Sequence, residues 1–173
     1  MDIETIFKME GLTWKSFNIL LIDDEPEYLT ELEELLSFDF SVSSTIDPDA
    51  VIPIVRDKNV SVVISDQRMP KKTGTQVLAA VKREFPNVIR ILMTGYADHD
   101  ATIEAINSGE VYRYISKKAP TDEKVALIKQ AIEVYYYRDA EVKRRELDKA
   151  LLLNRDHGVK DRYNELKTKK ENS

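Results

Sequence analysis

Short apolar runs alternate along this chain with segments in which apolar residues recur every three or four positions, as on one face of a helix. The strand-like runs lie at residues 18–22, 38–46, 60–64, 88–93 and 111–115. The helical segments lie at residues 28–36, 77–85, 101–106 and 125–135, and a further short helix is expected to open at Asp47 and Pro48. Such alternation predicts a parallel sheet with helices on both faces.

The composition of the five runs predicts their order in the sheet. Residues 18–22, 60–64 and 88–93 are almost continuously apolar, whereas residues 38–46 and 111–115 alternate with polar side chains. Inner parallel strands are buried on both faces, so the two alternating runs belong at the edges. We therefore predict an α/β fold, flavodoxin-like and doubly wound, with five helices and the strand order 2-1-3-4-5. Ligands of such sheets bind beyond the carboxyl ends of the first and third strands.

A change in charge predicts the domain organisation. Residues 138–173 hold 11 basic and 8 acidic residues, a net charge of +3, whereas residues 1–137 hold 15 and 23, a net charge of −8. We expect an N-terminal extension over residues 1–16, one domain over residues 17–137, and a helical tail or linker over residues 138–173. Ala140, Leu147 and Leu151 give that tail a weak apolar stripe, which suits dimerisation better than a stable coiled coil.

The residue inventory excludes several kinds of site. Cysteine is absent, the five glycines form no nucleotide-binding loop, and the two histidines lie too far apart to make a zinc-binding helix. The net charge of −5 is unlike that of a general nucleic-acid binder. The longest apolar run is too short to cross a membrane, and the N-terminus lacks the form of a signal peptide. We expect a cytoplasmic protein that binds neither nucleic acid nor membrane directly.

The polar residues that follow the strand-like runs form a chemical pattern. Asp23, Asp24 and Glu25 follow the first run, Asp66 follows the third, Thr94 the fourth and Lys117 the fifth. The predicted topology brings all of them to one edge of the sheet. Crowded carboxylates need a cation, and oxygen ligands with places left for water suit Mg²⁺. With a lysine and a hydroxyl nearby, such a cluster would receive a phosphoryl group well.

Four motifs in this order resemble the receiver domain of two-component response regulators, over about residues 17–137. They are Ile22-Asp23-Asp24-Glu25, Asp66-Gln67-Arg68-Met69-Pro70 with Gly74, Met93-Thr94-Gly95, and Tyr114-Ile115-Ser116-Lys117. Each motif alone is weak, since a pair of aspartates can simply cap a helix. The four together, each on the expected element, are specific.

The resemblance implies a role for each matching residue. Asp66 would be the phosphoacceptor, with Mg²⁺ held by Asp23, Asp24, Asp66 and the main-chain carbonyl of Arg68. Lys117 would contact the phosphoryl oxygens, Thr94 would sense the phosphoryl group, and Tyr114 would be the coupled aromatic switch. The donor would be a phosphohistidine on a histidine kinase or a histidine phosphotransfer protein. The domain would not be an enzyme beyond its own phosphorylation and autodephosphorylation.

One position departs from the family pattern. The family usually has a proline after the lysine of the last strand, joined by a cis bond, whereas Lys118 stands there in this chain. A cis bond before a residue other than proline costs about 3–4 kcal/mol, so we expect this loop to be arranged differently. Lys118 is then an alternative to Lys117 as the residue that contacts the phosphoryl group.

The output is open to three interpretations. In the first, phosphorylation switches the face made by helix 101–106, the last strand and helix 125–135, and so controls a downstream protein target or a homodimer that the tail extends. In the second, the chain is the receiver of a longer protein with a C-terminal output domain, such as a cyclic-dinucleotide phosphodiesterase. In the third, it is a receiver-like interaction module that is not phosphorylated. An aspartyl phosphatase of similar topology would need a DxD spacing that Asp23-Asp24-Glu25 lacks.

Overall fold

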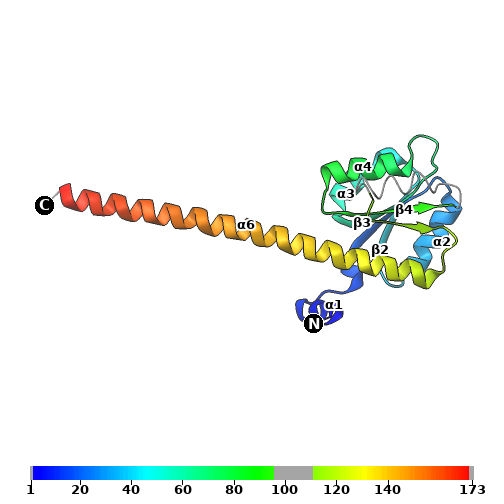
Figure 1. The fold of residues 1–173 in the computed structure, drawn as a ribbon, viewed down its shortest axis with the longest axis horizontal. Coiled ribbons are helices and arrows are strands. Elements are labelled where there is room, and N and C mark those ends of the chain that lie inside the picture. The colour runs from blue at the N-terminus through cyan, green and yellow to red at the C-terminus, as the bar shows by residue number, and fades with distance from the viewer. Residues whose placement is uncertain (1, 96–110, 172–173) are drawn as a thin grey trace. The chain divides into compact units, whose positions relative to one another are not determined.

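The computed structural model describes residues 2–95 and 111–171, with side chains up to residue 149. Five parallel strands form one sheet in the order β2-β1-β3-β4-β5, which confirms the predicted flavodoxin-like fold (Figure 1). The strands are β1 (Asn18–Ile22), β2 (Ser41–Thr45), β3 (Val60–Asp66), β4 (Ile89–Thr94) and β5 (Arg113–Ser116). The described helices are α1 (Ile3–Glu10), α2 (Pro26–Leu36), α3 (Val51–Asp57), α4 (Gly74–Glu84) and α6 (Thr121–Glu171). The helix predicted at residues 101–106 lies outside the described residues.

The alternation of side chains along the inner strands builds two cores. Ile19 and Leu21 of β1 belong to a cluster with residues of α2 and the first turns of α6. Leu20 and Ile22 point to the opposite face and pack with residues of α3 and α4. Side chains of a strand alternate between the two faces of its sheet, so a run that is apolar throughout must be covered on both sides.

The edge strand β2 begins later than its sequence pattern predicts. The apolar alternation over residues 38–46 predicts one continuous strand, but the ladder with β1 covers only Ser41–Thr45. Phe38 lies in the turn after α2 and is 84% exposed, whereas Phe40 is 2% exposed and fills the core. The local alternation was misleading because a turn had to fit between α2 and the strand.

The N-terminal segment contributes its own helix to the domain. Asp2 caps α1 by accepting a hydrogen bond from the Thr5 N–H at 2.9 Å. Phe7 is buried, with ring centroids 5.1 Å from Trp14, 5.1 Å from Phe17 and 5.4 Å from Tyr136. Aromatic pairs at these separations are favourable beyond the area that they bury. Residues predicted as an extension thus pack against the start of β1 and against α6.

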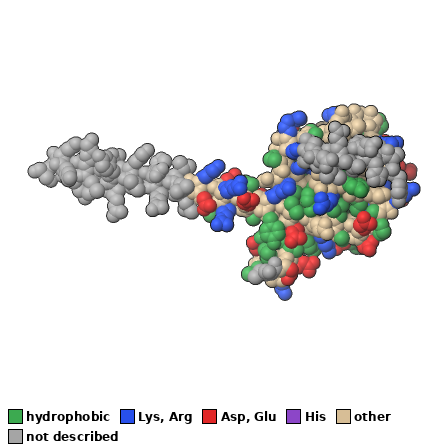
Figure 2. Space-filling view, in the orientation of Figure 1, with side chains coloured by type: hydrophobic (Ala, Val, Ile, Leu, Met, Phe, Trp, Pro, Cys, Tyr) green, Lys and Arg blue, Asp and Glu red, His purple; other side chains and the backbone are tan. Residues whose placement is uncertain are grey.

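The chain divides into two units, Met1–Tyr136 and Tyr137–Ser173. The first unit contains the sheet and the part of α6 that packs on it through Ile128, Ala131 and Ile132. The second unit contains the rest of α6, whose first described turns carry both basic and acidic side chains (Figure 2). Of the helices described, none has both the length and the apolar character that a membrane span requires.

Candidate functional site

Three carboxylates meet where β1 and β3 end. Asp23 follows β1, Asp66 is the last residue of β3, and these two strands are neighbours in the sheet. One oxygen from each of Asp23, Asp24 and Asp66 lies within 4.8 Å of the others. Asp23 and Asp66 are buried, whereas Asp24 is exposed. The three aspartates that the sequence predicts to converge are therefore together.

Asp66 is held by partners on both oxygens of its carboxylate. The Arg68 N–H donates to Asp66 Oδ2 at 2.8 Å, and Lys117 Nζ lies 3.1 Å from Asp66 Oδ1. Burial raises the pKa of the Asp66 carboxyl and the nearby Asp23 adds to this effect, while the hydrogen bond from Lys117 opposes it. An aspartate in an exposed turn would have neither this burial nor a neighbouring carboxylate and ammonium. Asp66 therefore differs in its environment from an ordinary turn residue.

Lys117 brings a positive charge into the cluster. Its Nζ lies 2.7 Å from Asp23 Oδ2, 3.0 Å from Glu25 Oε1 and 3.1 Å from Asp66 Oδ1. Burial is the largest single influence and lowers the pKa of Lys117, but the contacts with the three carboxylates together outweigh it and raise that pKa. Lys117 is therefore a firmly protonated partner of the acidic cluster.

The loop after β5 reaches this arrangement without a proline after the lysine. No cis peptide bond occurs among the described residues, so Lys117 and Lys118 are joined in trans. The Lys118 N–H donates to Ser116 Oγ at 3.1 Å, which tightens the turn after the strand. Of these two lysines, Lys117 is the one whose ammonium contacts Asp66.

The cluster has the character of a cation site. Asp23 Oδ2 is buried, and the charged group beside it among the described residues is the Lys117 ammonium, 2.7 Å away. Lys117 supplies one positive charge to a cluster of three aspartates, and the negative charge that remains favours a further cation. The donors available from Asp23, Asp24 and Asp66 are all oxygens, the ligand type that Mg²⁺ prefers.

Thr94 and Tyr114 lie on the next two strands. Thr94 is buried at the end of β4, and its carbonyl accepts a hydrogen bond from the Lys117 N–H at 2.9 Å. Tyr114 lies on the edge strand β5, opposite Leu92 in the register with β4, and is 47% exposed. Thr94 is thus tied to the lysine loop through the backbone, and Tyr114 is placed at the accessible edge of the sheet.

For three residues that contact Lys117, the sequence predicted no role at the site. Glu25 pairs with Lys117, and the carbonyl of Lys117 accepts hydrogen bonds from Tyr28 and Lys124. Glu25 directly follows the aspartate pair, so its place in that motif was a usable signal. Tyr28 lies on the apolar face of its helix, and Lys124 occupies a polar position of its own helix. Neither residue has a neighbouring sequence motif that predicts contact with the loop after β5.

The close approach of Gly74 to Asp66 leads to a test of how tightly the site is built. A Cβ atom added at Gly74 would lie 2.1 Å from the main-chain oxygen of Asp66, whereas one added at Gly95 meets nothing within 4 Å. Gly74→Ala should therefore lower the free energy of unfolding by roughly 1–3 kcal/mol through overpacking, as measured by urea denaturation. Gly95→Ala is the matched control. Equal losses in the two variants would contradict the predicted clash.

Comparisons with known proteins agree with this geometry. The family model of the response regulator receiver domain matches residues 19–129. The hydrogenase transcriptional regulatory protein HoxA of Cupriavidus necator is 32% identical over 119 residues, covering 69% of this chain and 25% of HoxA. The DNA-binding transcriptional regulator NtrC of Escherichia coli is 31% identical over 126 residues, covering 72% of this chain and 25% of NtrC. The chain thus spans about a quarter of the length of these curated relatives.

Solved structures give the same result. The signal receiver domain of an HD domain-containing protein from Pseudomonas fluorescens is 31% identical, with a TM-score of 0.68, and covers 75% of this chain and 95% of its own. A structure described as adenylate cyclase from Rhodopirellula baltica is 32% identical, with a TM-score of 0.69, and covers 76% of this chain and 96% of its own. Together with the acidic cluster and Lys117, these matches show that the chain belongs to the response regulator receiver domain family of two-component systems.

Proposed function

We propose that this chain is a phosphorylatable receiver in which Asp66 accepts a phosphoryl group from a phosphohistidine on a histidine kinase or a histidine phosphotransfer protein. The observation that carries the proposal is the Lys117 ammonium between the buried Asp23 and Asp66 carboxylates. A protonated lysine at this point would stabilise the negative charge on the oxygens of a phosphoryl group that is transferred to the Asp66 carboxylate. The acceptor oxygen is already oriented by the Arg68 N–H.

The transfer conserves atoms and charge through one displacement. A carboxylate oxygen of Asp66 forms a bond to phosphorus while the bond from phosphorus to the histidine nitrogen breaks. The leaving imidazole keeps the electron pair and can take up a proton from water. Lys117 would exchange part of its contact with Asp66 for the phosphoryl oxygens, and its side chain is long and flexible enough to do so.

Mg²⁺ is the cofactor that we propose for this step. Asp23, Asp24 and Asp66 would hold it together with the main-chain carbonyl of Arg68, and the oxygen-only donor set supports that assignment. When bound, the ion would neutralise negative charge on the phosphoryl oxygens. Without a cation other than Lys117, the approach of an anionic donor to three carboxylates would be strongly repulsive.

The first prediction identifies the acceptor. Acetyl phosphate with Mg²⁺ should add one phosphoryl group to the wild-type chain, as seen by intact-protein mass spectrometry, because a small-molecule donor needs only the site. Asp66→Asn should abolish the addition, since an amide oxygen is a poor nucleophile. Asp49→Asn, which changes an exposed aspartate ion-paired with Lys72, is the matched control and should be phosphorylated normally. Full addition to the Asp66 variant would rule out Asp66 as the acceptor.

The second prediction concerns the metal. A ligand that binds only the folded state stabilises it by RT ln(1 + [L]/Kd), about 2.7 kcal/mol at a hundredfold excess over Kd. Mg²⁺ should therefore raise the thermal midpoint of the wild type, and Asp24→Ala should remove most of that gain. Asp24 is exposed, so the variant should still fold. Glu34→Ala on α2 is the control; a metal response that survives Asp24→Ala would place the ion elsewhere.

For the output, we propose a protein–protein switch. Thr94 and Tyr114 would couple Asp66 to the face that includes β5 and the beginning of α6, through the hydrogen bond between Thr94 and the Lys117 loop. In the second unit, Asp139–Lys143 and Glu141–Arg145 form ion pairs at i,i+4 spacing, and Leu147 is 60% exposed. Described turns with so little apolar surface would support only weak self-association, which suits control by a modest change in free energy.

The third prediction tests this output by sedimentation velocity. Beryllofluoride, a mimic of the phosphoryl group, should shift the wild-type chain toward dimer, and truncation after Tyr137 should weaken the shift. Leu147→Gln should weaken it as well, whereas Glu146→Gln, the same new side chain one position away, should not. An identical monomer with and without the mimic would contradict the dimer and favour a tail that connects the receiver to a further output domain.

A further inference from the structure

The backbone of Lys117 is fixed on both sides by bonds from other elements. Its N–H donates to the carbonyl of Thr94 at 2.9 Å. Its carbonyl accepts a hydrogen bond from Lys124 Nζ at 2.8 Å and a longer one from the Tyr28 hydroxyl at 3.4 Å. The residue whose ammonium contacts Asp66 is therefore anchored to β4, α2 and α6 at once.

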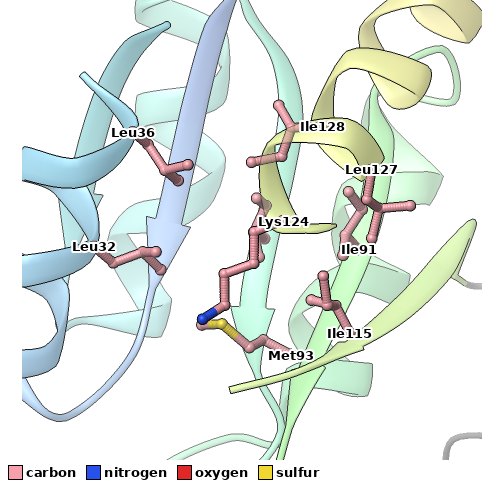
Figure 3. A pocket seen from close by; sticks show the side chains of 9 residues that line it. Leu32, Leu36, Ile91, Met93, Ile115, Lys124, Leu127 and Ile128 are labelled. Atoms are coloured by element: carbon pink, nitrogen blue, oxygen red, sulfur yellow. The ribbon is translucent and has the colours of Figure 1, made fainter. Parts of the chain in front are cut away.

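Lys124 makes its bond from an apolar setting. Its side chain runs between Leu32 and Leu36 of α2 on one side and Leu127 and Ile128 of α6 on the other, and its nitrogen lies beside the end of Met93 (Figure 3). Burial lowers the pKa of this ammonium, which reflects the cost of placing a charge there. A lysine that only covered apolar surface would extend its nitrogen to water, as such side chains usually do. Here the nitrogen turns inward to a main-chain carbonyl.

Tyr28 contacts Lys117 in two ways. Its hydroxyl lies 3.4 Å from the Lys117 carbonyl and 3.3 Å from the Met93 sulfur. Its ring lies below the Lys117 ammonium, with Nζ 4.9 Å from the ring centroid, within the range of a cation–π contact. Burial raises the pKa of Tyr28 to about 12, so its hydroxyl remains a donor at neutral pH.

These contacts lie next to the position where this chain has Lys118 and the family usually has a proline. The peptide bond between Lys117 and Lys118 is trans, and because residue 118 is not a proline, no ring fixes its φ angle. Free rotation of the backbone at this position would allow the Lys117 ammonium to move away from Asp66. Hydrogen bonds from Lys124 and Tyr28 to the carbonyl of that same peptide remove this freedom.

We propose that Lys124 and Tyr28 are positioning residues that hold the loop after β5 and thereby keep the Lys117 ammonium between Asp23 and Asp66. The proposal rests on the proposed function, because it assigns these residues to phosphoryl transfer at Asp66. Lys124 supplies the stronger constraint, since its bond is shorter and charge-assisted. Tyr28 supplies the weaker bond and the aromatic surface beneath the ammonium.

The experiment compares four variants of the full chain. Lys124→Met keeps the apolar length of the side chain and removes the donor, and Lys124→Arg restores a cationic donor. Tyr28→Phe keeps the ring and removes the hydroxyl. Lys129→Met, on the same helix, removes one positive charge from a lysine that lies over the Trp14 ring, and it controls for net charge.

Two readouts are measured at saturating Mg²⁺. The first is the rate at which acetyl phosphate phosphorylates Asp66. The second is the rate of reductive methylation of Lys117, followed by peptide mass spectrometry, which reports the position of the ammonium whether or not Asp66 is phosphorylated. The Lys117 side chain is 19% exposed and paired with three carboxylates, so its methylation in the wild type should be slow.

Lys124→Met should slow phosphorylation about tenfold, because small misplacements of a reacting group are costly, and it should speed methylation of Lys117. Its thermal midpoint should stay at or above that of the wild type, which separates positioning from folding. Tyr28→Phe should show a smaller change in the same direction, Lys124→Arg should recover both rates, and Lys129→Met should match the wild type.

Wild-type rates for both readouts in Lys124→Met would overturn the inference while leaving the proposed function intact. A wild-type chain that takes up no phosphoryl group would overturn the proposed function. In that case the methylation of Lys117 alone decides whether Lys124 and Tyr28 position it.

Discussion

The ion pairs of Lys117 are the interaction on which the functional edge of this sheet depends. Removing carboxylates from water costs several kcal/mol for each ion, and Asp23 and Asp66 are both buried. The Lys117 ammonium contacts both of them and the exposed Glu25 at hydrogen-bonding distances. Since the lysine reaches them from beyond β5, the pairing holds the loop of an edge strand against the centre of the sheet.

The sheet itself makes this meeting possible. In the order β2-β1-β3-β4-β5, the carboxyl ends of β1 and β3 are adjacent, so residues 43 positions apart in sequence, Asp23 and Asp66, become neighbours. Gly74 completes the arrangement, because the main-chain oxygen of Asp66 occupies the space that a side chain would need there. The site is thus a product of strand order and of one close backbone approach.

The parts that sequence reasoning could predict are those with a periodic or local signal. Inner strands such as β1 are apolar on both faces, and that pattern predicted the strand order correctly. The convergence of Asp23, Asp24 and Asp66 followed from the same topology. The packing of Phe7 on Tyr136 had no such signal, because it joins residues from opposite ends of the domain. The contact of Lys124 with the Lys117 carbonyl could not be predicted either, because charged residues on a helix usually face solvent.

The aromatic cluster beneath α1 also gives the protein a built-in optical probe. Trp14 is the single tryptophan of the chain, and its ring packs edge-on against Phe7 at 5.1 Å between centroids. The same Phe7 touches Tyr136, the last residue of the first unit. Indole emission depends on how far the ring is exposed to water, so the intrinsic fluorescence of this protein reports whether its N-terminal helix is seated on α6. Release of that helix can be followed without attaching any label.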